Sequence, residues 1–174
     1  MHNTSETTPR AALVLGLGNL LLSDEGVGVH VAQHVIRRYQ VPEQVRILDG
    51  GTLGLGLLPY LQGVTHLLVV DAVDAGQPPG AIVRLEGEEI PTALAHKMSM
   101  HQVGLQELLA LSQLSGDTPA HIVLIGVQPA SLEPGLEPSP LIAALLDTLA
   151  DRVVDELRAW GSSWRGRRFD PGLK

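Results

Sequence analysis

Hydrophobic residues along the chain gather into five short runs rich in Val, Leu and Ile, separated by stretches with helical spacing. The runs cover residues 11–17, 45–49, 65–71, 81–85 and 121–127. Short runs that are apolar at nearly every position are typical of strands buried on both faces of a parallel sheet. Their alternation with helices predicts an α/β fold, a three-layer α/β/α sandwich in which a twisted, mostly parallel sheet of about five strands carries helices on both faces.

The segments between these runs predict the helices. Val27, Val31 and Val35 form an apolar stripe with the period of an α-helix. A shorter segment contains Pro59, which would break a helix unless it lies in the first turn. Helices are predicted over residues 26–39, 100–114, 139–160 and, in short form, 54–62.

The length of 174 residues fits a single domain, residues 1–174. We expect the N-terminal extension 1–10 and the basic C-terminal tail 162–174 to be flexible. The apolar runs are much shorter than the roughly 18 residues of a membrane helix, and the first residues lack the pattern of a signal peptide. A soluble, cytoplasmic and monomeric protein with no membrane partner is expected.

Composition excludes several classes of chemistry. The chain has no cysteine, so it has no disulfide, no thiolate ligand and no cysteine nucleophile. Residues 1–157 contain 18 acidic and 7 basic side chains, a net charge of −11, whereas residues 158–174 contain 5 basic and 1 acidic, a net charge of +4. An acidic body argues against nucleic acid as a partner, because binding there depends on neutralising phosphates.

Acidic residues follow three of the predicted strands. Asp24 and Glu25 come after the first strand, Asp49 ends the second and Asp71 ends the third, with Asp74 beyond it. Ligands of open parallel sheets bind beyond the carboxyl ends of the strands, so these carboxylates are predicted to meet at one edge.

A histidine joins this group from a helix start. Ser99 and Gln102 have the spacing of a capping box, which places His101 in the first turn of the helix 100–114. Two carboxylates and one imidazole make a three-ligand site suited to a divalent ion such as nickel or zinc, with positions left open for another molecule.

Most of these residues also have a simpler interpretation, and His101 taken alone would be a surface histidine of the first helical turn. Asp24 or Glu25 can serve only as favourable charge at a helix N-terminus, and Asp49 before two glycines can be a turn residue. Asp71 favours function, because a carboxylate that ends an apolar strand is costly to bury unless it is paired or ligating. His30 and His34 have the spacing of a ligand pair but lie away from the strand ends, and we expect both to be solvated.

Five sequence blocks together resemble the hydrogenase maturation proteases, the nickel-dependent processing endopeptidases. The blocks are LVLGLGNLLLSDEGVGV, ILDGGTLGLGLL, HLLVVDAVDAG, HKMSMHQVGL and IVLIGVQPASLEPGLEPSP, and they occur in order between about residues 12 and 158. The resemblance implies an α/β/α fold and a nickel-recognition site at Glu25, Asp71 and His101. It also implies a substrate, the precursor of the large subunit of a [NiFe] hydrogenase, from which a short C-terminal extension is removed once nickel has been inserted.

The resemblance groups the chain with aspartic-type endopeptidases and leaves the mechanism open. In one scheme, nickel held by substrate cysteines and by the three ligands polarises a carbonyl or a water, with Asp24 or Asp49 as base. In the other, nickel only reports that the substrate is loaded, and a carboxylate activates water. Copper would outcompete nickel for a bare site of nitrogen and oxygen ligands, and zinc would rival it. Selectivity is therefore expected to come from nickel that arrives inside its substrate.

Two other functions remain possible from the residues alone. A nickel carrier or non-catalytic maturation chaperone would use the same three ligands without hydrolysis. A dinucleotide-binding module is suggested by Gly16 and Gly18 after the first strand, but the third glycine is missing and two acids stand where the pyrophosphate would bind. We therefore expect no nucleotide cofactor.

Overall fold

The computed structural model describes residues 11–94 and 100–161, and the side chains of Ala93, Met100 and His101 are not among those described. The two terminal segments that were predicted to be flexible, 1–10 and 162–174, lie outside the described residues. Ser99 of the predicted capping box does so too. No helix in the described ranges is both long and apolar enough to cross a bilayer.

The five predicted strands all form and make one sheet, with the order β2-β1-β3-β5-β4. The strands β2, β1, β3 and β5 run parallel, and β4 pairs antiparallel with β5 at the edge of the sheet. The mostly parallel sheet is therefore confirmed. The strands are β1 (Ala12–Leu17), β2 (Val45–Gly51), β3 (His66–Ala72), β4 (Ile82–Glu86) and β5 (His121–Val127).

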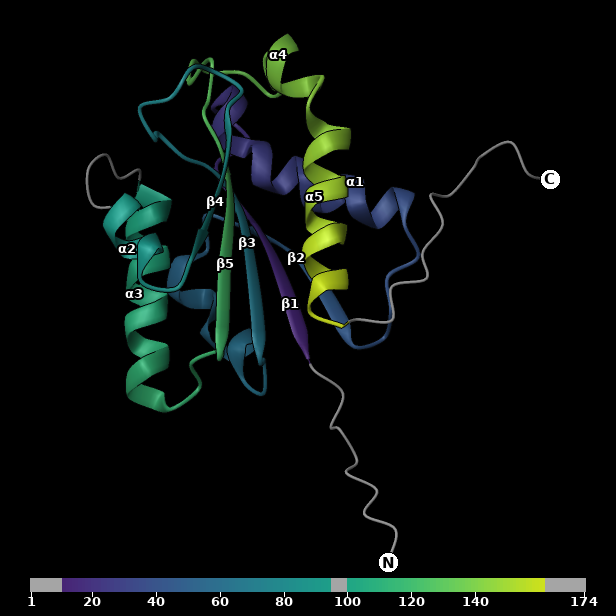
Figure 1. The fold of residues 1–174 in the computed structure, drawn as a ribbon. Coiled ribbons are helices and arrows are strands. Elements are labelled where there is room, and N and C mark those ends of the chain that lie inside the picture. Colours follow the sequence, from purple (N-terminus) through teal and green to yellow (C-terminus); the bar gives the residue numbers. More distant parts are fainter. Residues whose placement is uncertain (1–10, 95–99, 162–174) are drawn as a thin grey trace, which may run out of the picture.

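Helices cover both faces of the sheet, as Figure 1 shows, with α1 and α5 on one side and α2 and α3 on the other. The three-layer α/β/α sandwich is thus confirmed. The helical elements are η1 (Ser23–Gly26), α1 (Val27–Arg38), η2 (Gly54–Leu61), α2 (Glu89–Leu94), α3 (Met100–Ser115), α4 (Pro140–Ala143) and α5 (Leu146–Ala159).

Three helical segments differ from the sequence-based prediction. The helix predicted over 139–160 is interrupted between α4 and α5, where the N–H of Leu145 bonds the carbonyl of Ile142 and tightens the turn. The segment around Pro59 is a 3-10 helix. Helix α2 was not predicted, and its Pro91 lies in the first turn, where a proline removes no intrahelical hydrogen bond.

The core is divided by the sheet into two parts, because side chains of a strand alternate between its faces. In β1, Val14 packs in the cluster under α1 and α5, whereas Leu13 and Leu15 pack in the cluster under η2 and α3. Apart from Tyr39, both clusters consist of Leu, Val, Ile and Ala side chains with little or no exposed surface, which explains why the five strands are apolar at nearly every position.

Two glycines let α1 approach the sheet at backbone contact. A Cβ at Gly28 would lie 2.0 Å from the carbonyl oxygen of Val70, and one at Gly16 would lie 2.2 Å from the carbonyl oxygen of Gly28. Any side chain at either position would push the helix away from β1 and β3. These glycines therefore set the height of α1, and with it the position of η1 directly before it.

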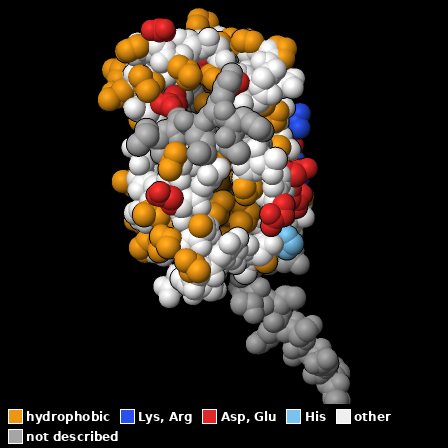
Figure 2. All heavy atoms as spheres, turned by 90° about the vertical axis from the view of Figure 1, so that its left-hand side faces the viewer, with side chains coloured by type: hydrophobic (Ala, Val, Ile, Leu, Met, Phe, Trp, Pro, Cys, Tyr) orange, Lys and Arg blue, Asp and Glu red, His pale blue; other side chains and the backbone are white. Residues whose placement is uncertain are grey.

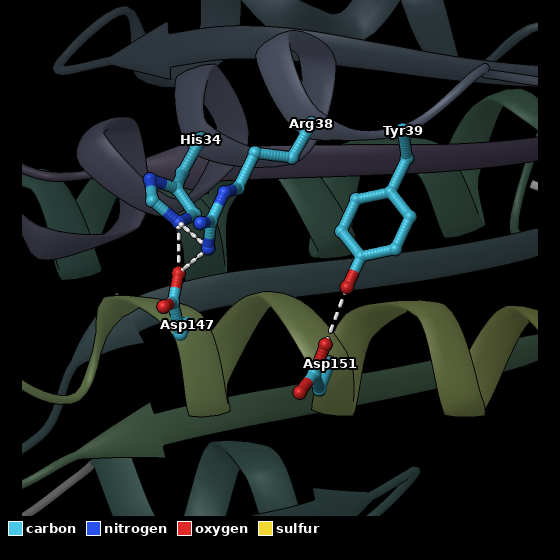
Figure 3. A network of polar contacts seen from close by, with 5 residues as sticks. All are labelled: His34, Arg38, Tyr39, Asp147 and Asp151. Carbon is cyan, nitrogen blue, oxygen red and sulfur yellow. Dashed lines mark hydrogen bonds and ion pairs between the residues drawn. The ribbon is translucent and has the colours of Figure 1, made fainter. Parts of the chain in front are cut away.

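Polar contacts join α1 to α5 on the outer side of the sandwich (Figure 3). His34 and Arg38 both contact the carboxylate of Asp147, and the hydroxyl of Tyr39 donates to Asp151. The expectation that His34 is solvated is therefore wrong, because the start of α5 comes close enough to pair with it. These contacts orient the two helices that cover one face of the sheet.

Acid should weaken this helix pairing. Hydrogen bonds from His34, and then from Arg38, hold the pKa of Asp147 below its usual range. A carboxyl whose pKa is lowered in the folded state stabilises the fold above its unfolded pKa, near 4, and this stability is lost as the pH falls through the folded pKa. Because the Asp147 side chain is 52% exposed, solvent screening keeps the contribution below about 1 kcal/mol.

We therefore expect Asp147→Asn to lower the free energy of unfolding by a few tenths to about 1 kcal/mol at pH 7, and by much less at pH 3 or below. Urea unfolding at both pH values measures the difference. Asp155→Asn is the matched control on the same helix, because Asp155 is 69% exposed and contacts Arg158 only weakly. Equal losses for both variants at both pH values would contradict the assignment.

Candidate active site at the carboxyl edge of the sheet

The carboxyl ends of the four parallel strands meet at one edge, the upper end of the molecule in Figure 1. The segments that leave this edge include η1 after β1, η2 after β2, and the long connection 128–139 between β5 and α4. The acids predicted from the sequence lie at or just beyond the strand ends. The predicted convergence of these segments is therefore present in the fold.

Glu25 is held at this edge by the backbone of the first loop. It is half-buried in η1, which contacts β3. Its carbonyl oxygen packs against Gly18, where a Cβ would lie only 1.7 Å away, and Gly18 has a φ of +126°. Only glycine combines that conformation with that contact. The turn after β1 is therefore filled by Glu25 itself.

Asp71 is completely buried at the end of β3. It shares a strand face with Leu67 and Val69, so it points toward the layer of α3. One carboxylate oxygen accepts the N–H of Ala72 at 2.8 Å, and the other lies 3.4 Å from the side-chain amide of Gln102. A buried, hydrogen-bonded carboxylate at a strand end is the arrangement for which the sequence favoured a functional role.

His101 is the second residue of α3 and directly precedes Gln102. Its backbone therefore starts the helix that contacts the end of β3, while its side chain lies outside the described part. Among the residues that the structure describes, no three His, Asp or Glu side chains form a ready-made metal cluster. The site made by Glu25, Asp71 and His101 stays a prediction.

Asp24 has a different environment from the one that a catalytic base requires. It is fully buried, and its carboxylate accepts four hydrogen bonds from the 128–139 connection. The donors are the N–H of Ala130 at 2.8 Å, the N–H of Ser131 at 2.8 Å, and the N–H and hydroxyl of Ser139 at 2.6 and 2.9 Å. Oδ2 of Asp24 accepts three of these hydrogen bonds, and Oδ1 accepts the one from the N–H of Ser139.

The base role suggested for Asp24 stays a prediction that this environment disfavours, since the carboxylate is buried and already accepts four hydrogen bonds. Asp24 anchors the 128–139 connection onto η1. Local sequence could not reveal this, because the partners lie more than 100 residues away. The only signal was the Ser139-Pro140 pair, a typical start of a helix, whose hydroxyl also faces Asp24.

Backbone contacts extend this anchor. The N–H of Ser23 bonds the carbonyl of Gly135, and the N–H of Gly135 bonds the carbonyl of Leu21. The Ser23 hydroxyl donates to the carbonyl of Glu133 at 2.7 Å, and Ser23 adopts a positive φ of 46°. This unusual conformation is maintained because the N–H and the hydroxyl of Ser23 both donate hydrogen bonds to the 128–139 connection. Hydrogen bonds therefore join residues 21–25 and 130–139 into one rim.

Asp49 is exposed, unlike Asp24 and Asp71. It lies near the end of β2, the outer strand of the sheet on that side, and pairs in register with Gly16. In the described part of the chain, no hydrogen bond to the Asp49 carboxylate is found that would make it a turn residue. Asp49 shares a strand face with Ile47 on the α1 side of the sheet, whereas Asp71 lies on the α3 side. An exposed carboxylate is accessible to a water molecule that it could deprotonate.

His30 lies on α1 near this acid. It is half-buried, and its Nε2 atom is buried with no hydrogen-bond partner among the described residues, so the expectation that it is solvated is wrong. Burial lowers the pKa of His30, with Arg37 acting in the same direction, while Glu137 and Asp49 oppose the shift. Burial therefore favours the neutral form of His30, against the opposing effect of the two acids.

Exposed leucines surround the edge. Leu21, Leu132 and Leu136 of the rim are 63%, 54% and 67% exposed, and Leu53 and Leu55 near the end of β2 are 62% and 44% exposed. Figure 2 shows that hydrophobic side chains are also spread over the face that α2 and α3 form. Exposed apolar side chains gathered around a candidate site are typical of surfaces that bind another protein.

The fold and this edge define an α/β/α domain with acidic groups beyond the strand ends, and comparison with known proteins identifies the family. The family model described as "Hydrogenase maturation protease" matches residues 29–156. The chain therefore belongs to the hydrogenase maturation proteases, and the resemblance seen in the sequence is confirmed.

Individual relatives agree. The chain is 44% identical over 155 residues to the hydrogenase expression/formation protein HupD of Rhodobacter capsulatus, covering 88% of this chain and 74% of that protein. The structure resembles the hydrogenase maturating endopeptidase HybD from E. coli, with a TM-score of 0.82 and 39% identity over 86% of this chain and 93% of that one. It also resembles the [NiFe] hydrogenase maturation protease HybD from Thermococcus kodakarensis, with a TM-score of 0.70, 27% identity, and coverage of 84% and 97%.

Proposed function

We propose that this protease removes a short C-terminal extension from the nickel-loaded precursor of a [NiFe] hydrogenase large subunit. The observation that carries the proposal is the family membership over residues 29–156, together with a buried Asp71 at the carboxyl edge of a sheet of the matching fold. Cleavage would complete the maturation of the large subunit.

Nickel is proposed to be part of the substrate, recognised by Glu25, Asp71 and His101. Two carboxylates and an imidazole are suitable donors for a borderline divalent ion. Glu25 and Asp71 are brought to the same edge by η1 and β3, and His101, in the first turn of α3, directly precedes the residue that contacts Asp71. A metal already held by the substrate completes its coordination here, so that an unloaded precursor binds weakly.

Asp49 is proposed as the carboxylate that activates water, which accords with an aspartic-type mechanism. It would accept a proton from the water as the oxygen attacks the scissile carbonyl, and the proton would pass to the leaving amine as the peptide C–N bond breaks. The ligands would contribute by positioning, since holding a scissile bond beside a base supplies a large part of the rate enhancement. In this scheme nickel is a recognition element of the substrate, and it does not activate the water.

A folded protein fits this edge better than a small molecule does. The rim presents Leu21, Leu132 and Leu136 to solvent. A dinucleotide is disfavoured by the turn after β1, because the carbonyl of Glu25 occupies the space beside Gly18 that a pyrophosphate would need. The rim is proposed to contact the surface of the precursor around its metal site.

Mass spectrometry of the purified precursor tests the function directly. The precursor, with and without nickel, is incubated with this protein, and loss of a C-terminal peptide from the nickel-loaded form alone is the expected result. The Asp49→Asn variant should cut neither form. If neither form is cut by the unmodified protein while it binds nickel tightly and stoichiometrically, a nickel carrier replaces the protease as the better proposal.

A further inference from the structure

Gln102 is a buried polar side chain that the proposed chemistry does not use. It lies in the first turn of α3, is 4% exposed, and reaches the end of β3. Its Nε2 atom is 2.9 Å from the carbonyl oxygen of Ala72 and 3.4 Å from Oδ2 of Asp71. Because a carbonyl only accepts, the atom that faces Ala72 must be the amide nitrogen, and its second hydrogen is directed to Asp71.

This contact restricts the one torsion of Asp71 that is otherwise soft. Rotation of a carboxylate about its last bond is broad, so one hydrogen bond leaves its plane poorly defined. The N–H of Ala72 holds Oδ1, and the amide of Gln102 holds Oδ2. The Gln102 amide is itself fixed by the shorter bond to Ala72. In the described part of the chain, these two contacts, one on each oxygen, restrain the direction in which the carboxylate presents its lone pairs.

We propose that Gln102 is a positioning residue for metal recognition: its amide orients the Asp71 carboxylate and ties the start of α3, which carries His101, to the end of β3. This inference rests on the proposed function, because it assigns Gln102 a role in the same nickel-reading site. Groups that orient metal ligands in this way are typically worth about 10–100-fold in metal affinity or activity.

Gln102→Met is the test variant, because methionine has a similar length, favours helices and cannot donate a hydrogen bond. Ser112→Ala is the matched control. Ser112 is also a fully buried polar residue of α3, but its hydroxyl bonds only the carbonyl of Leu109 in the same helix. Both variants remove a buried polar group from one helix, and only Gln102→Met affects Asp71.

Three readouts are compared: crystal structures, nickel affinity of the isolated protein by calorimetry, and the KM and kcat for cleavage of the nickel-loaded precursor. For Gln102→Met we expect a turned Asp71 carboxylate, a nickel Kd raised about 10–100-fold and a similar rise in KM. Ser112→Ala should leave all three near the wild-type values, with a comparable shift in Tm. If Gln102→Met does not fold, Gln102→Asn, whose amide is one methylene too short to reach both acceptors, replaces it.

An unchanged Asp71 carboxylate in the variant would overturn the proposal, and so would a turned carboxylate with unchanged nickel affinity and KM. Failure of the proposed function is seen separately, in the unmodified protein: if that protein neither binds nickel nor cuts the precursor, the metal-reading role is wrong. In that case the crystal structures still decide whether Gln102 sets the orientation of Asp71.

Discussion

Asp71→Asn is expected to reduce cleavage of the nickel-loaded precursor by about 100-fold or more, while the protein still folds. Asparagine keeps the size of the side chain and an oxygen that accepts the N–H of Ala72. It removes the negative charge, so the metal carried by the substrate loses an anionic ligand. A loss of about 3 kcal/mol of interaction with the bound metal corresponds to this factor.

The measurement is kcat/KM for the precursor, with Tm as the check on folding. Asp74→Asn is the matched control, since Asp74 lies three residues further along and its carboxylate accepts from Gly76 and Gln128 in the loop. This control should cleave within a few-fold of the unmodified protein. Normal processing by Asp71→Asn would show that the proposed metal site is wrong.

Asp24→Ala is expected to lower the free energy of unfolding by about 3–5 kcal/mol, because it leaves four donors of the 128–139 connection without their buried acceptor. For a domain of this size the loss corresponds to a fall in Tm of about 10 °C. Ser139→Ala provides the graded comparison. It removes one side-chain donor to Asp24 and the N-terminal cap of α4, which is worth about 1 kcal/mol.

Chemical denaturation measures the stability of both variants, and cleavage by the folded protein is assayed below the unfolding transition. Asp24→Asn, with no change in volume, is used if the alanine variant is not obtained in soluble form. We expect the variant that keeps more of the rim's hydrogen bonds, Ser139→Ala, to retain more cleavage activity than Asp24→Ala. Both variants should be more active than Asp49→Asn. An Asp24 variant with unchanged Tm and no cleavage at all would indicate that Asp24 acts directly in catalysis.

The strands could be predicted closely, because burial on both faces requires an apolar residue at nearly every position. The strand β5, predicted over 121–127, spans those residues in the structure. Helix α2 could not be predicted, since it is six residues long and its stability comes from Ile90 and Leu94 packing in the core rather than from a repeated pattern. The break before α5 is likewise a local turn in a continuous apolar pattern.

The site shows the same division. Asp71 could be singled out because an acid at the end of an apolar strand is costly unless it has a role. Asp24 and Asp49 could not be told apart, since each is an acid that follows or ends a strand near a glycine. Their difference lies in burial and in donors from a segment more than 100 residues away.

The sequence by itself determined the class of fold, the edge at which the acids gather and the family of the chain, because these follow from period, strand order and local motifs. The tertiary structure decided which carboxylate is an anchor and which is exposed, and it brought Gln102 to Asp71. Such roles depend on contacts between segments far apart in the chain. The hydrogen bond that joins α3 to β3 leaves no periodic pattern in the sequence, so it could not be predicted.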